Sequence, residues 1–357
     1  MLLNFGSSGS GGGGGTTTTA VRNMVLNGAM RSNQVGSAVT LTTPGGYSTY
    51  EKFCLDTYQM LGKSVNGSMT LTMSKDTDAP SGFSSSLKLV TDTGIPASIR
   101  DYLALEQFVP SERYIGFLGA SNVTMSFWIK STVTGVIDVS MQNKDRDWSY
   151  STPVAITASD TWQKVEVTIP RELTGTWSTG FHTQIVFLTC ANYQVNAVDT
   201  WENSFKLGSS SNTDILSGAG NTVNITGIQL EAGDTATDFE YTNQTTELLD
   251  ILSVFRQAPL FGAGSPWTTG AVAYIGVQFA VPMTSTPRLA LITPGTYTDG
   301  SYGDKAVLSF YDVGYTSLTK YGAVLVFNLE APVVPRQSVT IRDTVVSFDC
   351  RYKGLYN

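Results

Sequence analysis

Short runs in which apolar and polar residues alternate recur from about residue 20 onward, and this pattern restricts the fold more than any other feature of the chain. In the run 163–169, Val165, Val167 and Ile169 fall on one side and the residues between them are polar. A period of two is that of a β-strand with one buried face, so the run predicts an antiparallel sheet. Further strands of this kind are expected at 123–130, 136–141, 184–190 and 223–230.

The composition agrees with a chain built from strands. Asp, Glu, Lys and Arg make up 14% of the 357 residues, whereas an average soluble domain has about 25%. Hydrophobic residues make up 41%, which is too many for a disordered chain. We therefore predict an all-β protein whose main part is a jelly-roll β-sandwich.

One segment, 245–257, has helical periodicity instead, and it divides the chain. Thr245 or Thr246 is expected to cap its start, and Pro259 is expected to stop it. The predicted organisation is an N-terminal anchor and tether (1–20), a jelly roll (21–243), a linking helix (244–258) and a small C-terminal β-sandwich (259–357). In the last part, strands are expected at 271–281, 288–293, 306–311, 323–329 and 338–348.

The apolar side of this helix has two possible partners. Leu248, Ile251, Leu252 and Phe255 share one face because they are three or four residues apart. The stripe can form a seam between copies of the chain. It can equally pack on the chain's own sandwich, as the apolar face of a helix usually does.

The N-terminus combines an apolar tip with a glycine-rich stretch. Residues 6–19, GSSGSGGGGGTTTT, would lose too much conformational entropy on packing as a helix or strand, so we expect a tether. The large apolar side chains before it, Leu2, Leu3 and Phe5, are expected to anchor the chain in a groove of a larger assembly. The alternative is a frayed terminus.

Charge and hydropathy argue against nucleic-acid and membrane partners. The net charge is −7 and the lysines and arginines are spread thinly, so no basic stripe can neutralise phosphates. No run approaches the roughly 18 apolar residues that span a bilayer. The N-terminus also lacks the positive region of a signal peptide, which predicts synthesis in the cytoplasm.

No cofactor or metal site is predicted. His182 is the single histidine, and Cys54, Cys190 and Cys350 are too far apart for a zinc or redox motif, so buried thiols are expected. The glycine run is followed by neither a lysine nor a helix, so it has no means of binding phosphate. Asp-rich turns at 76–78, 145–147 and 299–304 lack the spacing of an EF-hand loop, and we assign no calcium to them.

Three segments carry a resemblance to a known family. They are Asn27-Gly28-Ala29-Met30, the pair MSFWIKSTVTGV (125–136) and TWQKVEVTIP (161–170), and ITGIQLEAGDTATDFEY (225–241), in that order. Over residues 23–257 the chain resembles a jelly-roll module, similar to carbohydrate-binding modules, of tail fibres, head fibres and other structural proteins of tailed bacteriophages. Family members end the following helix in Cys-x-Arg-Tyr-Tyr, whereas this chain has Val254-Phe255-Arg256-Gln257 and keeps only the arginine.

The resemblance implies a structural protein of a phage virion. Such a fibre or capsid-decoration protein would assemble in the cytoplasm of the host bacterium, bind other capsid or tail proteins through its N-terminus and form a homotrimer. Its β domains would project for attachment to the host surface. The alternative is a glycan-binding receptor protein whose jelly roll grips host polysaccharide, and a depolymerase is a further alternative.

The residues of the three segments chiefly specify the fold and do not by themselves form a binding site. The alternation places Phe127 and Ile129 in the core and Trp128 on the opposite face of the strand. In the last segment, Gly233 and Asp234 are expected to turn the chain so that Phe239 packs back onto the core.

The loop 142–150 is the strongest candidate for a binding site. A sugar-binding surface needs an aromatic ring for stacking, and amide and carboxylate groups for the hydroxyls. The alternative is a polar loop that merely caps the rim of a sandwich. Trp177, His182, Tyr193 and Trp201 have similar chemistry but are weaker candidates. The loop offers Asn143, Asp145, Asp147, Trp148 and Tyr150.

Catalysis is not expected. Glycan cleavage needs two carboxyl groups about 5 to 10 Å apart on either side of the bond. The sequence offers pairs such as Asp145 with Asp147, Asp76 with Asp78 and Glu231 with Asp234, but any chain of this length contains such pairs. We therefore predict a protein that is not an enzyme.

Overall fold

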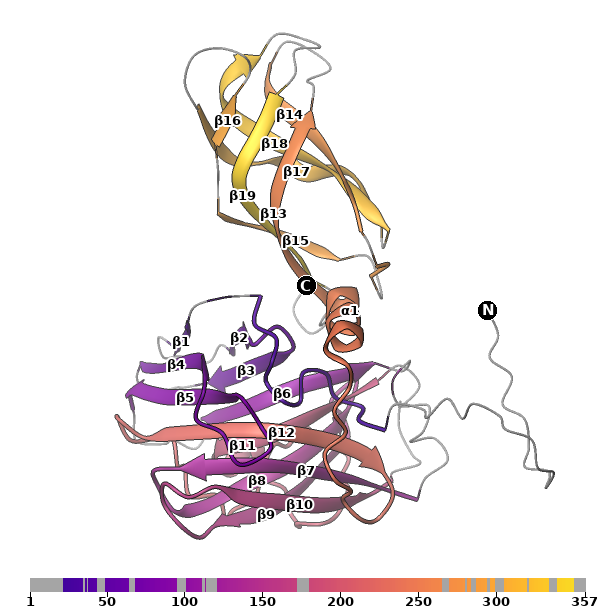
Figure 1. Ribbon diagram of the computed structural model, residues 1–357. Helices are drawn as coiled ribbons and strands as arrows, with labels where there is room; N and C mark the ends of the chain where they lie inside the picture. Colours follow the sequence, from indigo (N-terminus) through magenta and orange to yellow (C-terminus); the bar gives the residue numbers. More distant parts are fainter. Residues whose placement is uncertain are drawn as a thin grey trace, which may run out of the picture.

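The computed structural model of the chain is almost entirely β, which confirms the predicted fold class (Figure 1). The described part contains a single α-helix, α1, and a 3₁₀ turn, η2 (Ala191–Tyr193). It comprises residues 22–34, 36, 38–43, 49–63, 68–94, 101–110, 113, 121–171, 180–264, 270–279, 281–283, 287–293, 296–298, 305–319, 321–333 and 339–349. The predicted anchor residues Leu2, Leu3 and Phe5 lie outside it.

Two antiparallel sheets of six strands form the jelly-roll sandwich. Sheet A has the spatial order β1 (Val39–Thr43), β4 (Met69–Asp76), β5 (Ser86–Thr93), β12 (Thr222–Ala232), β7 (Asn122–Ser131) and β10 (Gln163–Pro170). Sheet B has the order β2 (Tyr50–Cys54), β3 (Tyr58–Lys63), β6 (Tyr102–Pro110), β11 (Gly180–Thr189), β8 (Gly135–Asn143) and β9 (Ser149–Ile156). All the strands predicted for this part are present, within a few residues of the expected ends.

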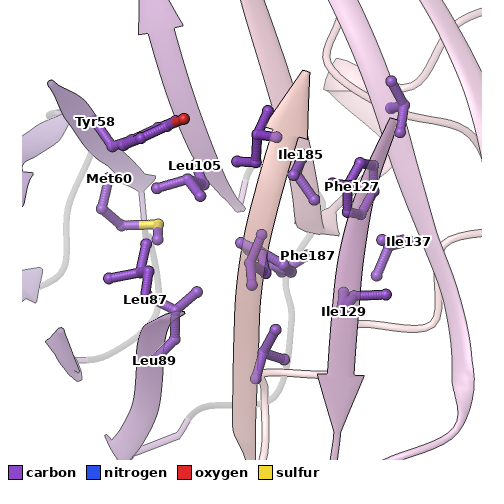
Figure 2. Close-up of a cluster of buried hydrophobic side chains, with 14 of the residues drawn as sticks. Tyr58, Met60, Leu87, Leu89, Leu105, Phe127, Ile129, Ile137, Ile185 and Phe187 are labelled. Atoms are coloured by element: carbon purple, nitrogen blue, oxygen red, sulfur yellow. The ribbon is translucent and has the colours of Figure 1, made fainter. Parts of the chain in front are cut away.

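The core lies between the two sheets. Figure 2 shows side chains from both sheets meeting there, among them Phe127 and Ile129 of β7 and Ile185 of β11. Edge strand β10 buries Val165, Val167 and Ile169 and exposes the residues between them, as its alternation predicts. Because burying a large apolar side chain stabilises a fold by about 1.5 to 3 kcal/mol, this core supplies the main driving force for folding.

The first and last family-like segments pack directly against each other. The amide of Ile228 donates a hydrogen bond of 3.0 Å to the carbonyl of Gly28, and a Cβ atom on Gly28 would lie 2.1 Å from the carbonyl oxygen of Ile228. Asn27 has a positive φ of 55° and uses its side chain to bond Ser32 and Leu55. Gly28 therefore holds the start of the module against β12, and Asn27 ties the same segment to the connection between β2 and β3.

Helix α1 (Gln244–Val254) has different ends from those predicted. Asn243, and not Thr245 or Thr246, caps it, because the Asn243 side chain accepts a hydrogen bond from the amide of Thr245. The helix ends at Val254, well before Pro259, because the chain turns extended at Phe255 and enters a strand.

The remaining strands form a third antiparallel sheet. Helix α1 lies between this sheet and the sandwich (Figure 1). Strands overlap all five predicted ranges, although the strand predicted at 306–311 extends to Thr319 and the strands at 255–264 and 296–298 were not predicted. Their order is β13 (Phe255–Gly264), β19 (Val339–Asp349), β16 (Thr296–Thr298), β17 (Lys305–Thr319), β18 (Gly322–Val333) and β14 (Gly270–Gln278), with β15 (Arg288–Thr293) also paired to β19.

Candidate functional site

The turn between β8 and β9 is the part of the predicted loop that faces solvent, and Asn143 fixes its shape. The Asn143 side-chain oxygen accepts hydrogen bonds of 3.1 Å from the amides of both Asp147 and Trp148, and its side-chain nitrogen donates one of 2.6 Å to Asp147 Oδ1. Arg146, inside the turn, adopts a positive φ of 57°. The turn is therefore held by its own side chains before any ligand arrives.

Not all of the five predicted glycan-binding residues are accessible. Asp145 and Asp147 are exposed and Trp148 is partly exposed. Asn143 and Tyr150 are buried, however, and the Tyr150 hydroxyl donates a hydrogen bond of 3.3 Å to Asp199. Burial raises the pKa of Tyr150, and the nearby negative charge of Asp199 raises it further. Asn143 and Tyr150 are thus support residues behind the surface and not contact residues, because the fold already uses their polar atoms.

The outer face of sheet B is covered by the chain itself. Residues 191–217, which we call the cover segment, run between β11 and β12 across this face. Leu207 of the cover segment is buried against Tyr102 and Val186. Gln142 donates a hydrogen bond of 2.6 Å to the Lys206 carbonyl, and Asn212 donates one of 2.8 Å to Asp138. A ligand cannot reach the middle of this face while the cover segment is in place.

A buried polar network lies beside the cover segment. Arg146 Nη2 is 2.6 Å from Glu106 Oε1, and His182 Nδ1 is 3.2 Å from the same oxygen. Gln184 donates to both Glu106, at 2.7 Å, and Gln142, at 2.9 Å. All five side chains are at most 5% exposed, which places His182 out of contact with any ligand at the surface.

The charges in this network shift each other's pKa values. Burial alone would raise the pKa of Glu106, but the Arg146 guanidinium and His182 hold it far below its usual range. Burial and the positive charge of Arg146 lower the pKa of His182, although Glu106 opposes this effect. The network therefore contains a permanent ion pair beside a histidine that is neutral at pH 7.

Of the other weaker candidates, Tyr193 packs edge-on against Tyr102 with ring centroids 4.7 Å apart, so it helps to seat the cover segment. Trp201 packs on Tyr150 at 5.4 Å and donates a hydrogen bond of 2.7 Å from its indole nitrogen to the Pro170 carbonyl. Trp177 lies outside the described residues.

A second group of accessible aromatic and charged side chains lies on the outer face of sheet A. Asp78, Trp128, Lys130 and Trp162, which we call the tryptophan patch, come from the β4–β5 connection, from β7 and from the residue before β10. Trp162 donates a hydrogen bond of 3.2 Å from its indole nitrogen to Asp78 Oδ1, and Lys130 forms an ion pair with the other oxygen of Asp78. The Lys130 ammonium also lies 5.7 Å from the centroid of the Trp162 ring.

Trp128 is held from behind. Gly227 lies at a bulge of β12 with a φ of 65°, and a Cβ atom there would come 2.6 Å from Phe83 and 3.2 Å from Trp128. Both rings therefore rest against the bare backbone of this glycine. Sequence reasoning placed Trp128 on the outer face correctly, but it did not single out the patch, because Asp78 arrives from a distant connection.

The sequence predicted that Phe239 packs into the core, and this prediction is wrong. It is half-buried on the outer face of sheet A, where it contacts Phe83 edge-on at 5.1 Å and Tyr241 at 4.8 Å. The reason is that residues 233–241 lie across the outside of the sheet, with the buried Gln229 accepting a hydrogen bond from the amide of Glu240.

The apolar stripe of α1 is divided between two environments. Ile251 and Phe255 are buried in a small cluster with Leu26 and Val254, so this half of the stripe packs on the chain's own sandwich. Leu248 is 40% exposed and Leu252 is partly exposed. Two ion pairs, Arg31 with Glu247 and Arg113 with Asp250 at 3.0 Å, tie the helix to the sandwich.

The carboxylate pairs considered for catalysis are engaged in different ways. Asp76 pairs with Lys88 and Asp78 with Lys130, and the pKa of each is lowered. Glu231 is buried and bonds Thr237. A general acid needs a raised pKa, so the Asp76–Asp78 pair does not suit that role.

Three further properties concern only the described residues. Within them no three His, Cys, Asp or Glu side chains gather in a way that could hold a metal ion. The side chains of Cys54 and Cys190 are both buried. No helix in that part of the chain is long and apolar enough to cross a membrane.

Comparison with known proteins gives structural matches only. No family model matches the chain, and no curated protein matches its sequence. The enzymatically active domain of tailspike protein 4 of bacteriophage CBA120 matches with a TM-score of 0.32 and 14% identity, over 59% of this chain and 21% of that one. The chain thus aligns with only about a fifth of the tailspike chain.

Two other solved structures match over almost their whole length. TmCBM61, solved in complex with β-1,4-galactotriose, has a TM-score of 0.31 and 14% identity over 59% of this chain and 99% of that one. A putative sugar-binding protein from Bacteroides thetaiotaomicron has a TM-score of 0.31 and 8% identity over 59% and 100%. At these scores the likenesses carry no argument about ligand or activity.

Proposed function

We propose that this chain is a non-catalytic attachment protein of a tailed-phage virion whose jelly roll binds glycan on the host surface. The observation that carries the glycan-binding part is the β8–β9 turn. There Asn143 fixes the exposed carboxylate of Asp147 and the backbone that carries the partly exposed indole of Trp148, and the exposed Asp145 lies in the same turn. A stacking ring beside fixed hydrogen-bond acceptors is the chemistry that recognises a sugar.

Rigidity strengthens this proposal. A ligand that binds a flexible loop must first offset the entropy of ordering it, whereas a turn fixed by three side-chain hydrogen bonds is already ordered. The buried Glu106–Arg146 ion pair makes the turn more rigid still, because Arg146 belongs to the turn itself.

The virion part of the proposal rests on the sequence resemblance. The first and last of the family-like segments hold the module together through Gly28 and Ile228. The virion location, the anchoring of residues 1–20 in a capsid or tail protein and a homotrimeric assembly belong to the same proposal. Cryo-electron microscopy of the intact particle tests them together, because buried density for Leu2, Leu3 and Phe5 would support the anchor and absence of the chain from the particle would refute it.

A glycan array of bacterial surface polysaccharides tests the binding part. Wild-type protein is expected to give a signal that Trp148→Ala weakens. Tyr321→Ala, which removes an exposed ring from the turn before β18, serves as the matched control. New reducing ends released from the bound polysaccharide would contradict the non-catalytic assignment. A signal equal in wild type and Trp148→Ala would show that the turn is not the binding site.

A further inference from the structure

The tryptophan patch is well separated from the β8–β9 turn. The turn precedes β9, whereas Trp162 follows the loop at the other end of that strand. Strand β9 has eight residues, so the two surfaces lie about 25 Å apart at a rise of about 3.3 Å per residue. A ligand at one does not contact the other unless it is a long chain.

The rings of the patch are fixed in place. The indole N–H of Trp162 is bonded to Asp78, and the Lys130 ammonium lies over its ring. Trp128 rests against Gly227. Lys164 on β10 is the register partner of Trp128, so Trp162, two residues earlier, lies diagonally across from Trp128 on the same face. Diagonal pairs of this kind are about 7 to 8 Å apart and can contact one ligand together.

The polar atoms of the patch have capacity left for a ligand. A carboxylate can accept about four hydrogen bonds and an ammonium group can donate three. The side-chain oxygens of Asp78 accept from Trp162 and Lys130, and the Asp78 side chain is 43% exposed. An acceptor and a donor side by side match the neighbouring hydroxyl groups of a sugar ring.

The charges of the patch indicate which sugars fit. Asp78 and Lys130 cancel each other, and the neighbouring Lys164 and Glu166 form an ion pair of 2.7 Å. A negatively charged sugar gains nothing from a surface whose charges are already paired. An uncharged sugar can stack on the indoles and bond to Asp78 and Lys130.

We propose that the tryptophan patch is a second glycan-binding site, which takes an uncharged pyranose unit of a polysaccharide. The inference rests on the proposed function and adds a second contact for the same class of ligand. A polysaccharide long enough to span both surfaces is then held at two points, and the second contact is made at a raised effective concentration.

Nitrogen-edited NMR spectroscopy of the full chain provides a site-resolved test, because the protein has six tryptophans and each gives one indole N–H signal. The probes are dextran, galactan and mannan oligosaccharides as neutral glycans, polygalacturonate as an anionic one, and purified bacterial surface polysaccharide. We expect neutral probes to shift the Trp128 and Trp162 signals. We also expect Trp162→Ala to weaken that binding about tenfold or more, equivalent to about 1.4 kcal/mol.

Asp78→Ala is the second variant, because it removes the carboxylate that orients Trp162 and would accept from the sugar, while both indole side chains stay in the chain. It is expected to weaken binding at the patch, while Tyr321→Ala is the control. Thermal unfolding of each variant shows whether it is folded. Binding that is unchanged in folded Trp162→Ala and Asp78→Ala overturns the second site.

The remaining outcomes separate the two proposals. Binding of bacterial polysaccharide with a shift at Trp148 but none at Trp128 or Trp162 overturns the second site and leaves the proposed function standing. Shifts at the patch with polygalacturonate alone overturn the assignment to uncharged sugars. A wild-type protein that binds none of these glycans overturns both the second site and the glycan-binding function.

Discussion

Arg146 and Glu106 form an ion pair of 2.6 Å in which both side chains are almost completely buried, at 5% and 2% exposure. Arg146 belongs to the exposed β8–β9 turn, whereas Glu106 lies on β6. The pair therefore joins the proposed binding turn to the middle of sheet B. Since a buried charge is tolerated only when it is paired, the turn cannot move away without leaving Glu106 uncompensated.

Removing one member of this pair should be costly. Arg146→Met leaves the Glu106 carboxylate buried without its main partner, and we expect a loss of about 3 to 5 kcal/mol in the free energy of unfolding. Urea denaturation followed by tryptophan fluorescence measures it. The double variant Arg146→Met with Glu106→Gln should recover part of the loss, and a double variant no more stable than Arg146→Met would contradict the pairing.

The buried His182 and the partly buried Asp214 should each make the free energy of unfolding depend on pH, with opposite signs. The pKa of His182 is lowered from 6.5, first by burial and then by Arg146. The unfolded chain therefore binds more protons than the folded one just below pH 6.5, and the free energy of unfolding falls as the pH drops through that range. Urea denaturation across this pH range measures the slope, which His182→Gln should reduce.

Asp214 of the cover segment acts in the other direction. Burial raises its pKa from 3.8 to about 6. Between these values the folded chain binds more protons, so this group's contribution falls as the pH rises from 3.8 to about 6. Asp214→Asn should remove that contribution and raise the stability at pH 7. A variant with the wild-type pH profile would contradict the assignment.

Close packing at Gly28 predicts a sharp effect of a single methyl group. In Gly28→Ala the Cβ would lie 2.1 Å from the Ile228 carbonyl oxygen, which is backbone and cannot rotate away. We expect a loss of about 2 kcal/mol or more in thermal or urea unfolding. Gly276→Ala is the matched control, because nothing lies within 4 Å of its added Cβ, and it should change the stability by less than about 0.5 kcal/mol.

The two halves of the α1 stripe should behave differently. Ile251 is fully buried, so Ile251→Ala should destabilise the chain by about 2 to 5 kcal/mol. Leu248 is 40% exposed, and Leu248→Ala should change the stability by less than about 0.5 kcal/mol. If the exposed half is the seam of a trimer, Leu248→Asp and Leu252→Asp should convert the oligomer to monomer in analytical ultracentrifugation. An unchanged mass would exclude this seam.

The sequence predicts an element well when its environment is local. Strand β10 is an edge strand with one solvent-facing side, and its alternation alone places Val165 and Lys164 correctly. In contrast, every residue of β11 is buried, because the cover segment closes its outer face. The polar Gln184 then faces a covering chain, which no pattern within the strand reveals. Phe255 likewise fits the helical spacing but begins a strand, because it packs into the cluster with Leu26.

Site residues are harder to predict than strands, because the same polar side chain can contact a ligand or the backbone. Asn143 has the chemistry expected of a sugar contact, yet both its side-chain oxygen and its side-chain nitrogen bond within the turn. At Trp128 the sequence misses a candidate site instead of predicting a wrong one. It places Trp128 on the surface without revealing that Asp78 and Trp162 lie nearby. Only the folding of separate connections onto one face shows that grouping.

One pair of variants can show whether Asn143 supports the turn or contacts the glycan directly. Asn143→Ala removes the acceptor for two turn amides and the donor to Asp147, so it should loosen the turn and weaken glycan binding there. Asn143→Asp keeps the acceptor for the two turn amides but replaces the donor with a charge that repels Asp147, so it should keep the exchange of those amides slower than the alanine variant does. Amide hydrogen exchange at Asp147 and Trp148 supplies a readout that a simple contact residue would not change. Faster exchange in Asn143→Ala together with weaker binding is expected, whereas weaker binding with unchanged exchange would mean that Asn143 touches the ligand directly.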